Sequence, residues 1–230
     1  MPENLSFWDH LDELRKVIIR SLCAWFIAAV AAFFAKDWLF AWLMKPLGAE
    51  QRLINIDVTA PFVIHIQVSL CIGFVVALPL IIYQLYGFIA PALYTDEKRF
   101  TIIGMVCSVF LFAAGVALNY FLIFPLSFRF LSTYQVTPMV VNQISLSSYI
   151  SLLLVLSIMM GLLFDVPILT WILSKMGILQ REHLRRYRKH VFVGILIVAA
   201  VITPTGDPIT LLLVTVPVYL LYELSILAIR

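Results

Sequence analysis

The sequence predicts an all-α protein that crosses a membrane six times, and three observations indicate this fold class. First, 63% of the 230 residues are hydrophobic and 13% are charged, whereas soluble domains carry roughly 45–50% apolar and about 25% charged residues. Second, residues 58–95 and 100–128 contain no Lys, Arg, Asp or Glu. Third, the basic residues gather on one side of the expected spans. These features exclude a soluble enzyme, a disordered chain and a nucleic-acid-binding module.

The expected spans follow from the length of the apolar runs, because a helix needs about 20 residues to cross a core of roughly 30 Å. Charges, prolines and turn residues divide a single domain over residues 1–230 into six spans, at about 17–35, 62–88, 100–124, 149–174, 191–203 and 208–222. The apolar cores of the last two reach only ~18–20 Å. They predict a short helical hairpin that tilt or a thinned bilayer accommodates, with a re-entrant hairpin as the alternative.

The orientation follows from the positive charges. The N-terminus, the loops after the second and fourth spans and the C-terminus together hold most of the 16 Lys and Arg residues. Both termini are therefore expected in the cytoplasm, in a multi-pass protein of the cytoplasmic (inner) membrane. A cleaved signal peptide is the alternative for the first span, but Glu3, Asp9, Asp12 and Glu13 are unsuited to its basic leading region.

Two acidic clusters lie on the expected cytoplasmic side, where anionic lipids usually favour basic residues. The first lies in residues 4–20, an amphipathic segment expected on the membrane surface, and the second contains Asp96 and Glu97. Their simplest roles are an i,i+4 pair between Asp12 and Lys16 and the capping of the third span. The sharper hypothesis is a cationic partner, above all one with guanidinium groups, which pair bidentately with carboxylates.

Asp165 is the only carboxylate deep inside an expected span, and an intramembrane acid suggests a functional site. The alternative is a carboxyl that is hydrogen-bonded at the kink before Pro167. The basic run at 181–190 is expected to anchor the topology, and Trp38 and Trp42 predict an interfacial helix on the outer side. We find no catalytic motif, no C-x-x-C and no metal-ligand spacing, so catalytic residues, metals and cofactors are not expected.

Over essentially its whole length the chain resembles the TatC family, the core polytopic subunits of the twin-arginine protein translocase. The resemblance rests on residues 10–15 (His-Leu-Asp-Glu-Leu-Arg), 57–62, 88–94, 97–99, 124–126, 164–167, 203–207 and 221–223, taken in this order. It implies a concave, glove-like bundle that acts as a receptor and assembly platform rather than an enzyme. Such proteins bind the twin-arginine signal peptides of folded cargo and recruit TatA-like and TatB-like single-span subunits. They work as homo-oligomers within a receptor complex, use the proton motive force, and bind no nucleic acid.

The resemblance also assigns roles to residues at the cytoplasmic side. The acids that contact the signal peptide fall on Glu13 and Glu97, and the basic residues of the same motifs fall on Arg15 and Arg99. Phe88 matches a further position that is important in the family. Two carboxylates would suit the two guanidinium groups of the peptide.

The remaining assignments lie within or beyond the membrane. The intramembrane acid falls on Asp165, where relatives commonly carry Glu or Gln, and the polar partner-subunit contact falls on Thr203 and Asp207. Leu211 stands where many relatives have Gln, and Pro46 matches a structural loop position on the outer side.

Two other functions compete with this interpretation. One is a small proton- or ion-coupled secondary transporter that uses Asp165, and the other is an inert membrane anchor. The single intramembrane acid and the lack of internal repeats count against the transporter, and the paired cytoplasmic acids count against the anchor.

Overall fold

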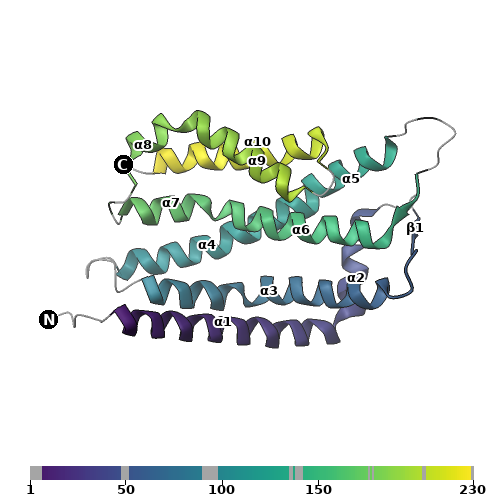
Figure 1. Ribbon diagram of the computed structural model, residues 1–230, viewed down its shortest axis with the longest axis horizontal. Coiled ribbons are helices and arrows are strands. Elements are labelled where there is room, and N and C mark those ends of the chain that lie inside the picture. The colour runs from purple at the N-terminus through teal and green to yellow at the C-terminus, as the bar shows by residue number, and fades with distance from the viewer. Residues whose placement is uncertain are drawn as a thin grey trace.

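The long apolar runs form long helices that lie side by side (Figure 1). The computed structural model describes residues 7–47, 52–89, 98–134, 137, 142–175, 177, 179–203 and 206–228. In chain order the elements are α1 (Phe7–Phe34), α2 (Lys36–Leu43), the 3-10 turn η1 (Lys45–Leu47), β1 (Leu53–Ile54), α3 (Ala60–Ile89), α4 (Lys98–Leu118), the π-helical segment η4 (Asn119–Ile123), α5 (Phe124–Thr133), β2 (Ile144–Ser145), α6 (Leu146–Phe164), α7 (Val166–Lys175), α8 (Arg181–Arg186), α9 (Arg188–Ile202) and α10 (Pro208–Ala228).

The all-helical membrane class is confirmed. Within the described residues, five helical stretches are long and apolar enough to cross a membrane: Leu11–Phe34, Ala60–Phe88, Ile102–Thr133, Leu146–Lys175 and Pro208–Leu227. Many large apolar side chains on these helices are exposed, such as Phe26 and Phe110, which is expected where helices face lipid. The two strands span two residues each and pair in parallel, so that Leu53 lies opposite Ile144 and two distant loops meet at one end of the bundle.

The amphipathic segment at the N-terminus does not form a separate surface helix over its described part. From Phe7 onward it is continuous with the first apolar run, in one helix of 28 residues. The buried Val17 and Ala29 lie on the same helix, and Trp25 Nε1 donates to the Leu70 carbonyl of α3 at 2.8 Å. The charged N-terminal segment and the first span are therefore one helix that packs against α3, which the charge pattern did not reveal.

The sequence predicted that the third apolar run ends near Pro125, and the structure shows that it continues. The helix continues through the π-helical segment, where the Phe124 N–H donates to the Asn119 carbonyl, and on to Thr133. Pro125 stands in the first turn of α5, a position that tolerates a missing N–H. A break in hydrogen-bond register thus replaces the predicted end of the helix.

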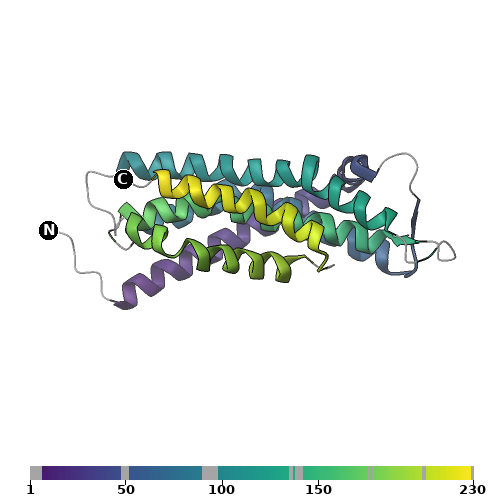
Figure 2. The ribbon, with the colours of Figure 1, turned by 90° about the horizontal axis from the view of Figure 1, so that it is seen from above.

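Only one helix of the last hairpin is short. α9 has 15 residues, about 22 Å, whereas α10 has 21 residues, so the prediction of a second short helix is wrong. α10 passes its expected end because Glu223 pairs with Arg188 at 2.7 Å and the Tyr222 hydroxyl donates to the Leu184 carbonyl at 2.7 Å. Figures 1 and 2 show that the turn between α9 and α10 stops short of the end formed by α5 and β1.

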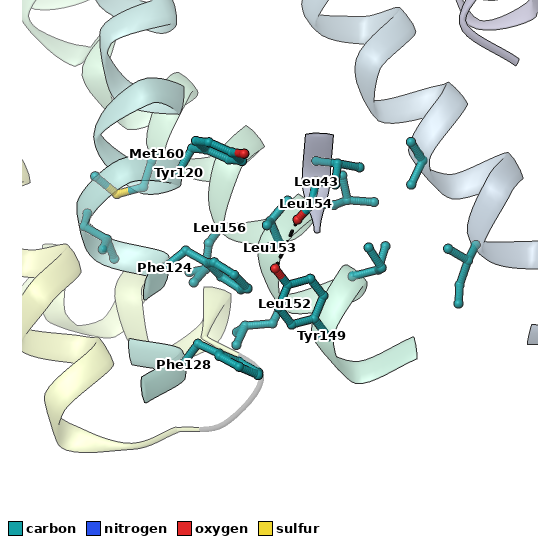
Figure 3. Packing of buried hydrophobic residues seen from close by; sticks show 14 of the residues in the cluster. Leu43, Tyr120, Phe124, Phe128, Tyr149, Leu152, Leu153, Leu154, Leu156 and Met160 are labelled. Atoms are coloured by element: carbon teal, nitrogen blue, oxygen red, sulfur yellow. Dashed lines mark hydrogen bonds between the residues drawn. The ribbon is translucent and has the colours of Figure 1, made fainter. Parts of the chain in front are cut away.

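The main buried cluster lies toward that same end and joins α2, α5 and α6 (Figure 3). Tyr149 is 1% exposed, and its ring packs edge-on against Phe124 and Phe128, with centroids 5.1 and 5.0 Å apart. Its hydroxyl donates to the Leu43 carbonyl at 3.0 Å. One side chain therefore links α2 to the aromatic rings of α5, which fixes this end of the bundle.

Candidate functional site

The helices that carry Glu13, Phe88 and Arg99 each have one terminus at the same end of the bundle. Figure 1 shows the start of α1, the end of α3 and the start of α4 at the end where N and C are marked, and Figure 2 shows that α1 and α4 start on opposite sides of it. α1 and α3 run antiparallel and touch where a Cβ on Gly73 would fall 2.5 Å from the backbone of Ala29. Counting equally along both helices from this contact brings Glu13 level with the last turn of α3, the turn that carries Phe88.

Glu13 lies in the second turn of α1, with a half-buried side chain, while Arg15 is exposed. The Glu13 carboxylate has no ion pair or hydrogen bond to any residue that the structure describes. Phe88 is half-buried and Arg99 stands in the first turn of α4. Asp96 and Glu97 lie outside the described residues, directly before α4 begins at Lys98. The end of the bundle thus presents an acid that a cationic ligand can reach.

Asp165 stands at the break between α6 and α7, as expected from Pro167. Its Oδ1 atom is buried without a hydrogen-bond partner in the described part of the chain, and the Ser108 side chain of α4 lies within hydrogen-bonding reach of the carboxyl. Among the described residues the Tyr86 hydroxyl of α3 is likewise buried without a hydrogen-bond partner, and a Cβ on Gly104 would lie 3.2 Å from it. Three helices therefore bring polar groups together around Asp165.

Sequence reasoning missed the companions of Asp165 and a second buried polar group, Asn119. Asn119 is fully buried in the π-helical segment, and its Nδ2 donates to Ser157 Oγ at 2.9 Å. An amide inside an uncharged apolar run is a signal that could have found it. Tyr86 and Ser108 give no such signal, because both are ordinary residues of a membrane helix.

Thr203 and Asp207 lie at the turn between α9 and α10, and both make local hydrogen bonds. Thr203 is buried and its hydroxyl donates to the Ala199 carbonyl at 2.9 Å. Asp207 Oδ2 accepts from the Thr210 N–H at 2.7 Å, which caps the start of α10. In this arrangement both polar groups stabilise helix ends.

Pro46 lies at the other end of the bundle, in η1. It lines a groove of about 290 Å³ together with Trp42 and Tyr120. The Trp42 and Tyr120 rings stack with centroids 4.0 Å apart, and the Tyr120 hydroxyl donates to the Trp42 carbonyl at 2.7 Å. Pro46 therefore borders an aromatic contact that holds α2 against the π-helical segment.

Known proteins resemble this chain over most of its length. The family model described as Sec-independent protein translocase protein (TatC) matches residues 9–217. The Sec-independent protein translocase protein TatC of Aquifex aeolicus (strain VF5) is 37% identical over 222 residues, which cover 95% of this chain and 92% of that protein. The protein of the same name from Escherichia coli (strain K12) is 34% identical over 221 residues, covering 94% and 85%.

Two solved structures also resemble this chain. A crystal structure of the twin-arginine translocase receptor TatC matches with a TM-score of 0.85 at 37% identity, covering 95% of this chain and 96% of that one. A second, of the receptor in DDM, matches with a TM-score of 0.88 at 36% identity, covering 96% and 99%. The family model and the relatives match most of the chain, the solved structures share its fold, and the chain belongs to the TatC family of Sec-independent protein translocase proteins.

Proposed function

We propose that the protein is the signal-peptide receptor and assembly core of a twin-arginine translocase, with Glu13 and Glu97 as the acids that bind the paired arginines. The observation that carries the proposal is the half-buried Glu13 carboxylate, which has no partner in the described part of the chain and is level with the end of α3. The family is that of a translocase component, so the protein is not an enzyme. The alternative of a secondary transporter finds no support in the comparisons.

Charge chemistry supports a guanidinium ligand. A carboxylate on a half-buried site is partly shielded from water, so a charge-assisted hydrogen bond to it is stronger than on an open surface. Arg offers two parallel N–H donors, and Lys offers one compact charge. Glu97 precedes α4 directly in the sequence, so it would supply a second acid at the same end of the bundle. Arg15, Arg99 and Phe88 would border the peptide there.

The membrane arrangement belongs to the same proposal. Six spans place both termini in the cytoplasm, with α9 as the short fifth span, and the charge distribution supports this orientation. In a concave bundle, the Asp165 cluster would be the intramembrane polar site. Thr203 and Asp207 would contact TatA-like or TatB-like subunits, and Pro46 would shape the outer loop. Copies of the chain would assemble in the receptor complex, in the inner membrane, and the proton motive force would drive transport.

Photo-crosslinking in inverted inner-membrane vesicles tests the receptor site and the orientation together. Leu11 is 41% exposed and lies near Glu13 on α1. With a photoreactive residue in place of Leu11, we expect a crosslink to a twin-arginine signal peptide that is added outside the vesicles. An excess of unlabelled peptide with Arg-Arg should compete, and the same peptide with Lys-Lys should compete poorly.

The matched control is Trp38, which is 70% exposed on α2 near the opposite end of the bundle. A photoreactive residue at Trp38 should give no crosslink to the added peptide. A crosslink from Trp38 and none from Leu11 would contradict the proposed site and its orientation.

A further inference from the structure

A basic groove lies where α8 meets α9, at the end of the bundle that carries both termini (Figure 1). Its volume is about 640 Å³. The residues that line it are Arg185, Arg186, Arg188, Lys189, Phe192, Val193 and Tyr219. Four cations therefore border one opening, while an aromatic and an aliphatic side chain of α9 and a tyrosine of α10 form its apolar wall.

One cation of this groove is held in an ion pair, and the other three are exposed to a ligand. Arg188 donates to Glu223 Oε2 at 2.7 Å, and the Tyr219 hydroxyl donates to the other oxygen of the same carboxylate at 3.0 Å. Arg185, Arg186 and Lys189 are exposed and form no ion pair with any residue that the structure describes. The groove thus keeps an excess of positive charge on a rigid base.

The position of the groove determines what can reach it. α9 is largely exposed along its length, with Val193 and Ile197 exposed by 52% and 59%, so its apolar surface faces lipid in a membrane. The cations stand at the start of this helix, at the level where headgroups lie. The positive end of the α9 dipole adds to their charge, and the N-cap residue Tyr187 offers no side-chain acceptor to the first N–H groups.

We propose that this groove binds the phosphate of an anionic phospholipid, with Arg185, Arg186 and Lys189 on the headgroup and Phe192, Val193 and Tyr219 against the first part of the acyl chains. Basic pockets between membrane helices suit such headgroups. A cationic peptide is repelled here, so this site is distinct from the end of α1. The inference does not rest on the proposed receptor function.

Native mass spectrometry of the purified protein in detergent tests the site. Phosphatidylglycerol is titrated in, phosphatidylcholine is the zwitterionic comparison, and inorganic phosphate is the competitor. We expect the intact protein to retain phosphatidylglycerol in preference to phosphatidylcholine. The variant Arg185→Gln/Lys189→Gln should bind phosphatidylglycerol roughly thirtyfold more weakly, and Arg185→Lys/Lys189→Arg should keep the affinity.

The matched control is Lys16→Gln/Arg20→Gln, which removes one Lys and one Arg from exposed positions on α1. This control should retain the affinity of the intact protein. Equal phosphatidylglycerol affinity in both Gln variants would overturn the proposal. Displacement of the lipid by millimolar inorganic phosphate would overturn the lipid assignment in favour of a free-phosphate site.

Discussion

Replacing Tyr149 by alanine is expected to lower the free energy of unfolding by about 3–5 kcal/mol. The ring is fully buried and packs edge-on against Phe124 and Phe128, and the hydroxyl donates to the Leu43 carbonyl at 3.0 Å (Figure 3). Alanine would leave a cavity where α2, α5 and α6 meet and an unsatisfied carbonyl beside it. Unfolding in mixed micelles, followed by tryptophan fluorescence, measures the change.

Two further variants act as controls, one for the hydrogen bond of this ring and one for its burial. Tyr149→Phe keeps the ring and should cost only about 1 kcal/mol. Tyr83→Ala removes the same side chain from an exposed position on α3, where 64% of the residue is accessible, and should change stability little. A loss for Tyr83→Ala as large as that for Tyr149→Ala would contradict the assigned role of the cluster.

A methyl group added at Gly115 or Gly73 is expected to destabilise the protein by about 1–3 kcal/mol or more. A Cβ on Gly115 would lie 2.5 Å from the Met160 carbonyl oxygen, and one on Gly73 would lie 2.5 Å from Ala29 Cα. Both obstacles are backbone atoms, so α4 would have to separate from α6, and α1 from α3. Small residues allow such close approach in membrane bundles. The same unfolding measurement tests Gly115→Ala and Gly73→Ala.

Gly194 is the matched control for these substitutions. It also lies inside a helix, but a Cβ there would meet nothing within 4 Å. Gly194→Ala should therefore be neutral or stabilise the protein by about 0.5–1 kcal/mol, because alanine favours the helix. If all three alanines behaved alike, close helix contact would not be what requires glycine at Gly73 and Gly115.

The apolar runs were sufficient to predict the long helices. Where those helices end depends on tertiary contacts and hydrogen bonds, which the pattern of apolar residues does not show. The paired Glu223 let α10 continue to Ala228, and the change to π-helical hydrogen bonding let the third run pass Pro125. The helix at Trp38 and Trp42 was predicted correctly, since both aromatic residues lie in α2, and its place at the outer membrane interface stays a prediction. The pairing of β1 with β2 joins distant loops of unremarkable sequence, so local pattern could not predict it.

Part of the candidate site could also be predicted from the sequence, and part could not. The order of the spans along the chain was enough to place the Glu13 segment and Phe88 at one end, because every second loop returns to the same side of a membrane. The order of the spans could not show that Tyr86 and Ser108 lie near Asp165, since that arrangement depends on how three helices rotate against one another. It also did not reveal the groove at Arg185, because the cations there looked like a topology anchor.

The central claim is that carboxylates at the α1 end recognise paired guanidinium groups, and direct binding of a labelled signal peptide in lipid nanodiscs tests it. The peptide carries Arg-Arg or Lys-Lys, and the protein is intact, Glu13→Ala/Glu97→Ala, or Asp12→Ala as the matched control at a neighbouring exposed acid.

Loss of charge-assisted bidentate pairs should cost on the order of 1–3 kcal/mol, about ten- to hundredfold in affinity. The account predicts that Arg-Arg binds more tightly than Lys-Lys to the intact protein and to Asp12→Ala. The Glu13→Ala/Glu97→Ala variant should lose this difference. Equal binding of both peptides to all three proteins would contradict the claim and leave the two acids as elements of helix structure alone.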